Sequence, residues 1–272
     1  MDLDRITVFC FAASYAVALA MEVLHLLRPA VIGRLVAHVT AGAGLFAHTL
    51  YLISHGRPLA GRPLAVLFLS WILAVFYLYG SLHHRRVAWG VFVLPVVLGL
   101  VLLAWLSPYV TEPANLTAWT EAEQVWVVLH FTLLMLGSVG VCVGFVASVM
   151  YLVQAWRLRH KKLAGEGLRL LSLERLEAMN RRAINLAFPL FTAGLLIGAW
   201  LWQSIDLPWT DPKVLSAGAF WVVSLVLLYL RYGLHLHGRR LAVGTVAAFA
   251  LLILVMVIHF LAETAHPSGG AL

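Results

Sequence analysis

Long apolar runs alternate with short polar segments along the whole chain. Eight of these runs are close to the ~20 residues that a helix needs to cross the ~30 Å hydrocarbon core of a bilayer. The fifth run is longer, and we expect its last turns to continue into the aqueous phase. The pattern predicts eight membrane-spanning helices, at residues 6–27, 35–54, 64–82, 87–106, 125–156, 184–202, 215–232 and 241–262.

The composition agrees with this pattern. Of the 272 residues, 62% are hydrophobic and only 11% are charged, whereas soluble domains carry about 25% charged residues. The residues before the first run, Met1 to Arg5, lack the basic region of a signal peptide, so we expect that run to be retained as a helix. The chain is therefore predicted to be an all-α, polytopic membrane protein that forms one integral membrane domain over residues 1–272.

Lysine and arginine gather in alternate loops between the predicted helices. An excess of these residues marks the cytoplasmic side of a membrane protein. The opposite side carries only four of the 19, which are Arg5, Arg57, Arg62 and Lys213. This distribution predicts a protein of the bacterial cytoplasmic membrane with both termini outside. It also explains most of the net charge of +7, so the charge requires no nucleic-acid partner.

The longest polar loop, residues 157–183, lies on the basic side that we assign to the cytoplasm. Its second half mixes leucines with arginines and glutamates, and Ser172 precedes this stretch at a position suited to capping a helix. We expect an amphipathic helix that lies on the inner membrane surface. Docking of a cytoplasmic partner protein is the alternative.

Residues 200–213 form a polar, aromatic and proline-broken segment between two apolar runs. The segment holds three tryptophans, two aspartates, two prolines and one lysine. Irregular backbone beside a membrane is tolerated mainly where protein, water or a ligand satisfies its polar groups. The charge distribution places the segment outside, and we expect the functional site to lie there.

The twelve histidines separate by predicted depth. Five lie among arginines at the cytoplasmic boundary, where solvated roles are expected, and four gather at the level of the tryptophan-rich segment: His55, His130, His259 and His266. Neutral imidazole is a common axial ligand of haem iron. Tryptophan faces suit a porphyrin ring, and Lys213, Arg57 or Arg62 could meet its propionates. The alternative is the ordinary enrichment of aromatic residues at membrane interfaces.

Several segments resemble one known family. They are Gly198-Ala-Trp-Leu-Trp202, Trp209-Thr-Asp-Pro-Lys213, Val128-Leu-His130, Leu227-Leu-Tyr-Leu-Arg231 and Gly238-Arg-Arg240. Together they resemble the cytochrome c assembly family of CcsA- and CcmC-type haem-handling membrane proteins, whose signature is a tryptophan-rich outer "WWD" loop. The length and the eight predicted helices are similar to the HemX/YpjD branch.

The resemblance implies a haem site at the outer face. It implies that His130 and His266 are the iron ligands and that the outer loop forms a platform of Trp200, Trp202, Trp209, Asp211 and Lys213. Because the chain has no Cys-x-x-Cys-His motif, the haem is expected to be non-covalent and b-type. The chain departs from the family at Trp209-Thr-Asp211, where Trp-x-Trp-Asp is usual, and at Tyr229, where an inner histidine is usual. Further candidates to contact haem are His48, His259 and Tyr229.

The leading hypothesis is a haem-binding protein that assists cytochrome c assembly or regulates haem supply. Its work would be positioning and protection of the iron, so we expect an assembly factor or chaperone rather than an enzyme, with other assembly subunits as partners. One alternative is a proton-coupled transporter that uses Glu22, His38 and His48. Another is a membrane scaffold that recruits an enzyme of tetrapyrrole synthesis through residues 157–183.

Overall fold

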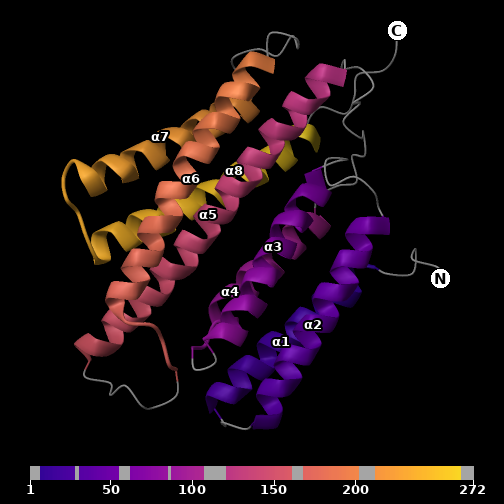
Figure 1. Cartoon of the computed structure of the whole chain (residues 1–272), viewed down its shortest axis with the longest axis vertical. Coiled ribbons are helices and arrows are strands. Elements are labelled where there is room, and N and C mark those ends of the chain that lie inside the picture. Colours follow the sequence, from indigo (N-terminus) through magenta and orange to yellow (C-terminus); the bar gives the residue numbers. More distant parts are fainter. Residues whose placement is uncertain are drawn as a thin grey trace. The chain divides into compact units, whose positions relative to one another are not determined.

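All regular elements in the described part of the chain are helices. The computed structural model describes residues 7–27, 31–54, 62–84, 87–106, 121–160, 168–201 and 212–264. The helices, shown in Figure 1, are α1 (Val8–Leu27), α2 (Val31–Ser54), α3 (Arg62–His83), α4 (Gly90–Leu106), α5 (Glu121–Arg159), α6 (Leu173–Leu201), α7 (Pro212–Tyr232) and α8 (Arg239–Thr264). The prediction of an all-α fold is confirmed for these residues.

Among the residues that the structure describes, five helices are long and apolar enough to cross a membrane by length and composition. These are the stretches Val8–Leu27, Ile32–Ser54, Leu64–His83, Glu123–Arg159 and Leu173–Leu201, and two shorter apolar stretches are Gly90–Leu106 and Ala217–Tyr232. Since several such helices occur in one chain, the protein is a multi-pass membrane protein. The number of eight spans and the outer position of both termini stay predictions.

The chain divides into two compact units. The first contains Met1–Ser107 and Val153–Leu173, and the second contains Pro108–Leu152 and Glu174–Leu272. The α5 helix therefore contributes to both units. Whether residues 1–272 act as one membrane domain stays a prediction, and the two units are described separately below.

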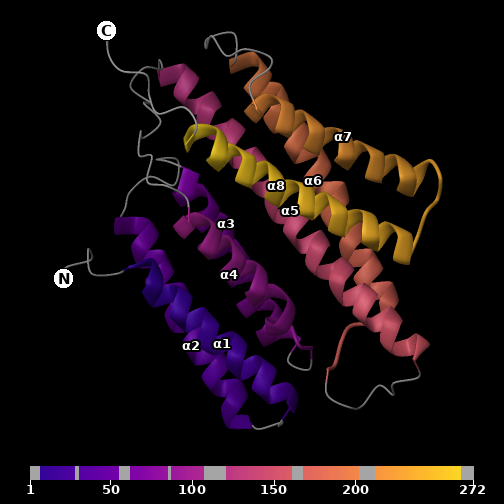
Figure 2. The same ribbon diagram turned by 180° about the vertical axis from the view of Figure 1, so that it is seen from behind.

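In the first unit, α1 packs on α2 and α4, and α3 packs on α4 and α2. Both ribbon views show α1 beside α2 and α3 beside α4 (Figures 1 and 2). Its core is aromatic and aliphatic, with Phe11, Tyr15, Leu69, Leu73 and Tyr77 fully buried. Large apolar side chains in close contact supply most of the packing energy of such a bundle.

A buried carboxyl group lies within this first unit. The hydroxyl of Tyr77 donates a 2.8 Å hydrogen bond to Glu22 Oε1, which satisfies part of that side chain. Gly90 on α4 packs directly against it, because a Cβ atom at this position would lie 2.5 Å from Glu22 Cγ. The absence of a side chain at Gly90 is therefore what allows Glu22 to be accommodated.

In the second unit, α5 and α6 run antiparallel and approach closely through glycines. A Cβ atom on Gly137 would lie 3.1 Å from Phe191, and one on Gly140 would lie 2.8 Å from the Cβ of Ala187. Small residues at such positions let membrane helices pack backbone to backbone. Phe145 of α5 stacks on Phe249 of α8, with ring centroids 4.0 Å apart, and Figure 2 shows these helices side by side.

A polar cluster ties three helices of the second unit together. The amide nitrogen of Asn180 (α6) lies 2.8 Å from Ser148 Oγ (α5) and 3.3 Å from Thr245 Oγ1 (α8). All three side chains are buried. Hydrogen bonds between buried polar side chains fix the register of helices that apolar packing alone would leave free to slide.

The basic loop is partly helical. The α5 helix continues to Arg159, and α6 begins at Leu173 and runs without interruption into its apolar part. The amphipathic stretch after Ser172 is therefore continuous with α6. The backbone carbonyl of Arg169 accepts a 3.1 Å hydrogen bond from Ala88, and Arg157 donates to the carbonyl of Leu168. The cytoplasmic location of residues 157–183 stays a prediction.

Candidate functional site

His130 of α5 is held against the backbone of α6. Its Nδ1 atom lies 2.6 Å from the carbonyl oxygen of Gly194. Since a carbonyl oxygen can only accept, Nδ1 carries the proton and Nε2 keeps its lone pair. No hydrogen bond to Nε2 is found among the described residues. This arrangement, in which a backbone carbonyl fixes the tautomer and the ring orientation, is typical of metal-ligating histidines.

Two glycines of α6 make room for this side chain. A Cβ atom on Gly198 would lie 2.5 Å from His130 Cε1 and 2.9 Å from its Nδ1. One turn earlier, a Cβ atom on Gly194 would lie 2.8 Å from Leu134 Cδ2. Any side chain at these two positions would push the α5 side chains outward, so the sequence of α6 determines where the imidazole lies.

An aromatic pair lies next to this imidazole. Trp126 precedes His130 by one turn of α5, and its ring meets that of Trp200, near the end of α6, at 5.7 Å and an interplanar angle of 63°. Both indole side chains are exposed. Edge-to-face pairs of this kind hold each other in place and still leave ring surface open to a ligand.

For some of the other predicted site residues the structure describes the backbone but not the side chain. Trp200 lies in the last turn of α6, and Lys213 is the second residue of α7, although its side chain is outside the description. His259 lies on α8, again without a described side chain. Four predicted residues lie outside the described residues: Trp202, Trp209, Asp211 and His266. Among the predicted platform residues, only Trp200 has a described side chain. It meets Trp126, one turn of α5 before His130.

Tyr229, which we predicted to stand where the family has an inner histidine, lies on an exposed face. Its side chain is 61% exposed, and its ring packs against Gly233. Tyr232, three residues later, exchanges hydrogen bonds with Asn185 of α6. Asn185 and Gly194 are nine residues apart, about 14 Å along the helix. Tyr229 therefore belongs to the other end of this unit from His130.

His48 is fully buried in the first unit. Its Nδ1 lies 3.3 Å from the hydroxyl of Tyr15, and its ring stacks on Phe11 at 4.1 Å with an interplanar angle of 1°. Its Nε2 is buried without a hydrogen-bond partner. His38 differs, because its Nδ1 bonds to the Arg34 carbonyl at 2.7 Å and its Nε2 bonds to Ser81 Oγ at 2.6 Å.

Three residues of this site were missed by the sequence-based prediction as contributors: Trp126, Gly194 and Gly198. Their spacing carries a signal. Trp126 lies four residues before His130, and the two glycines are four residues apart, so each pair occupies one face of a helix. The spacing does not show that the Trp126–His130 pair of α5 faces the Gly194–Gly198 pair of α6. That relationship depends on how the two helices pack.

The fold and the site together define a multi-pass helical membrane protein. It presents an imidazole whose Nε2 has no hydrogen-bond partner in the described part of the chain, close to an aromatic pair. A family model described as "Cytochrome C assembly protein" matches residues 62–266, which is well over half of the chain. The chain belongs to the cytochrome c assembly protein family. His130 and helices α5 to α7 fall within the matched range.

Curated relatives carry names that agree with this family. The chain is 23% identical over 264 residues to the cytochrome c biogenesis protein CcsA of Gloeobacter violaceus, covering 78% of each chain. It is 27% identical over 193 residues to protein HemX of Bacillus subtilis, covering 70% of this chain and 69% of HemX. No solved structure gives a significant match. The predicted resemblance to this family, with its HemX-type members, is confirmed.

Proposed function

We propose that this protein assists cytochrome c assembly by binding haem non-covalently at the outer face of the membrane. Family membership supports the role in assembly. The observation that carries the haem site is the His130 imidazole, whose Nδ1 is bound to the Gly194 carbonyl and whose Nε2 is left without a partner among the described residues. An imidazole held in this way is suited to serve as an axial ligand of haem iron.

The residues around His130 fit a porphyrin. Trp126 and Trp200 expose indole surface beside the imidazole, and flat aromatic side chains bind flat macrocycles by burying apolar area. A hydrogen bond from Nδ1 to a carbonyl raises the basicity of Nε2, which strengthens its bond to a metal. When bound, the haem would supply its iron, and the protein would orient it and shield it from water.

We assign the second ligand to His266 and the rest of the platform to Trp202, Trp209, Asp211 and Lys213. This assignment is supported by the family resemblance and by the order of the chain. His266 follows the end of α8 at Thr264 by two residues, and Lys213 follows the first residue of α7, Pro212. The lysine would meet a haem propionate as a charge-assisted hydrogen-bond donor.

A second intramembrane contact is proposed for His48. Its Nε2 is the only histidine nitrogen that is both buried and unpaired among the described residues. Such an atom is costly in an apolar interior unless a ligand satisfies it. His259 and Tyr229 remain weaker candidates, because the first has no described side chain and the second faces outward.

The transporter alternative is supported by a different observation in the first unit. Tyr77 bonds to Glu22, and Ser81, one turn later on α3, bonds to His38. These two pairs lie on consecutive turns of α3, and protonatable side chains that follow one another within a membrane are candidates to pass protons. Proton uptake by proteoliposomes would separate the two functions: a flux that Glu22→Gln abolishes favours transport, and no flux above protein-free vesicles removes this alternative.

The absorption spectrum of purified protein tests the proposal. Wild type, His130→Ala and His160→Ala are purified and reconstituted with haem, and the Soret absorbance per chain is compared. His160 is a matched control because it is exposed, directly follows α5 and bonds to the Trp156 carbonyl of that helix. The proposal expects the Soret band to be lost in His130→Ala alone. Equal bands in all three proteins would refute it.

A further inference from the structure

Arg231, in the last turn of α7, is a buried cation that has no counter-charge among the described residues. Its side chain is only 4% exposed, and its Nη1 has no hydrogen-bond partner. Among the described residues its guanidinium pairs with no carboxylate, and a close neighbour is the ring of Tyr232, 5.8 Å away. A buried charge is retained at such a position when an opposite charge compensates the lost hydration. Arg231 therefore indicates an anionic partner from outside the described residues.

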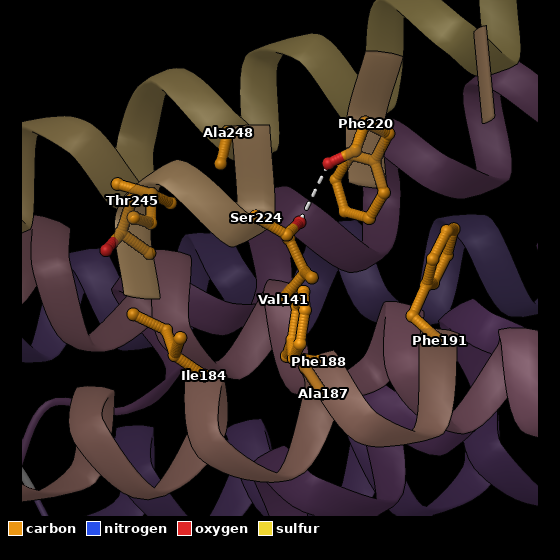
Figure 3. Close-up of a pocket in the computed structure, with 10 residues that line it drawn as sticks. Val141, Ile184, Ala187, Phe188, Phe191, Phe220, Ser224, Thr245 and Ala248 are labelled. Atoms are coloured by element: carbon orange, nitrogen blue, oxygen red, sulfur yellow. Dashed lines mark hydrogen bonds between the residues drawn. The ribbon is translucent and has the colours of Figure 1, made fainter. Parts of the chain in front are cut away.

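Arg231 continues a stripe of α7 that lines a cavity. Phe220, Ser224, Leu227 and Arg231 fall within a sector of about 60° on the helix. The first three line a cavity of about 30 Å³ between α6, α7 and α8, to which α5 contributes Val141 (Figure 3). Arg231 lies one turn beyond Leu227, about 6 Å along the axis. The cavity and the buried cation thus occupy one face of the same helix.

The walls of the cavity suit a hydrocarbon chain. They are formed mainly by Ile184, Phe188, Phe191 and Phe220. Its two hydroxyl groups are already engaged, because Ser224 donates to the carbonyl of Phe220 at 2.9 Å and Thr245 donates to that of Leu241 at 3.0 Å. No free polar group of these side chains remains for a ligand. The volume is too small for a macrocycle and fits part of a linear alkyl chain.

The surroundings of Arg231 in sequence are basic. The α8 helix begins with Arg239 and Arg240, both exposed, and its first turn contains no acidic residue. Cations at a helix N-terminus are repelled by the partial positive charge of the helix dipole. A nearby anion would be attracted both by these arginines and by the helix N-terminus. Between the two helices, Leu234 is exposed and offers an apolar contact at the same level.

We propose that an anionic phospholipid binds the second unit at this arginine-rich end. Its phosphate would pair with Arg231, and part of one acyl chain would lie along the cavity below Phe220 and Leu227. The general excess of basic residues on the cytoplasmic side explains exposed arginines such as Arg240. It does not explain a guanidinium that is buried and unpaired. The site is independent of haem and does not use His130.

Lipid binding by the full-length protein in nanodiscs tests this site. Bound phosphatidylglycerol is quantified by native mass spectrometry for wild type, Arg231→Gln and Arg240→Gln, and thermal midpoints are compared in phosphatidylglycerol and phosphatidylcholine. Loss of a buried charge partner weakens binding strongly, and we expect about a tenfold loss for Arg231→Gln. The exposed control Arg240→Gln should change binding less than about twofold.

A second variant keeps the test decisive if Arg231→Gln fails to fold. Ser224→Leu fills the cavity and leaves no described partner unpaired, because among the described residues the Ser224 hydroxyl bonds only to its own helix. This variant should lose phosphatidylglycerol while Arg231 is intact. Three results would overturn the proposal: undiminished phosphatidylglycerol binding by folded Arg231→Gln, undiminished binding by Ser224→Leu, or a thermal shift that inorganic phosphate alone reproduces.

Discussion

Gly198 and His130 approach so closely that a Cβ atom on the glycine would lie 2.5 Å from Cε1 of the imidazole. The glycine belongs to the motif that carries the family resemblance, and the histidine is the proposed iron ligand. Their contact gives the glycine a physical role: it leaves the space in which the ring can reach the Gly194 carbonyl.

Replacing Gly198 with alanine should therefore weaken haem binding. The added methyl group forces the imidazole away and breaks its hydrogen bond to Gly194. We expect about a tenfold loss of haem affinity, equivalent to about 1.4 kcal/mol, measured by haem titration. Gly218→Ala is the matched control, because a Cβ atom there meets nothing within 4 Å. Equal affinities for the two variants would show that the close contact is irrelevant to binding.

The Trp126–Trp200 pair should contribute to both packing and haem binding. An edge-to-face pair contributes about 0.5–1.5 kcal/mol beyond its area. In a double-mutant cycle of Trp126→Ala and Trp200→Ala, we expect a coupling energy in this range for haem affinity. Trp105→Ala, an exposed tryptophan of the first unit that contacts Phe9, serves as the control. A coupling energy of zero would show that the two indoles contribute independently to haem affinity, which would contradict this prediction.

Asn180→Ala should destabilise the second unit only modestly. The variant loses the bonds to Ser148 and Thr245, but each hydroxyl keeps a bond to its own helix, at 2.8 Å and 3.0 Å. With no group left unsatisfied, the cost should be about 1 kcal/mol, measured by unfolding in mixed detergent. A loss of more than about 3 kcal/mol would mean that Asn180 has a further role.

Gly90→Ala should destabilise the first unit. The new methyl group overlaps Glu22, whose carboxylate is held by Tyr77, so the buried hydrogen bond must break or the helices must separate. We expect a loss of about 1–3 kcal/mol, measured by unfolding in mixed detergent. On the same helix, a Cβ atom on Gly99 would meet nothing within 4 Å, and Gly99→Ala should be neutral or stabilising by up to about 1 kcal/mol. Equal stabilities would contradict the packing described.

Each apolar run predicted from hydropathy corresponds to one helix in the described part of the chain, but the ends of those helices were not predicted. The range 184–202 corresponds to α6, which begins earlier, at Leu173, and the range 125–156 corresponds to α5, which runs from Glu121 to Arg159. Apolar composition marks the part of a helix that suits lipid, whereas backbone hydrogen bonds continue through polar residues such as Glu174 and Arg181. At α7 the local signal was present, because Pro212 is favoured as a first helical residue.

The sequence predicted which histidine and which tryptophan belong to the site, but it did not predict how they are arranged in space. His130 and Trp200 were expected to act together from the family resemblance. The carbonyl of Gly194, which fixes the tautomer of His130, is a backbone group. Every residue has such a group, so its role cannot be predicted from residue type. Arg231 likewise appeared as one of many basic residues at the membrane boundary, because burial depends on how α7 packs and not on its local sequence.

The most direct test of the account is chemical rescue of His130→Gly. We propose that Nε2 of this imidazole binds haem iron, so the variant should lose the low-spin absorption spectrum of the wild type. Free imidazole should enter the vacated space and restore that spectrum, whereas the same addition should leave the wild type unchanged. A His130→Gly protein whose spectrum without imidazole equals that of the wild type would contradict the assignment of His130 as the ligand.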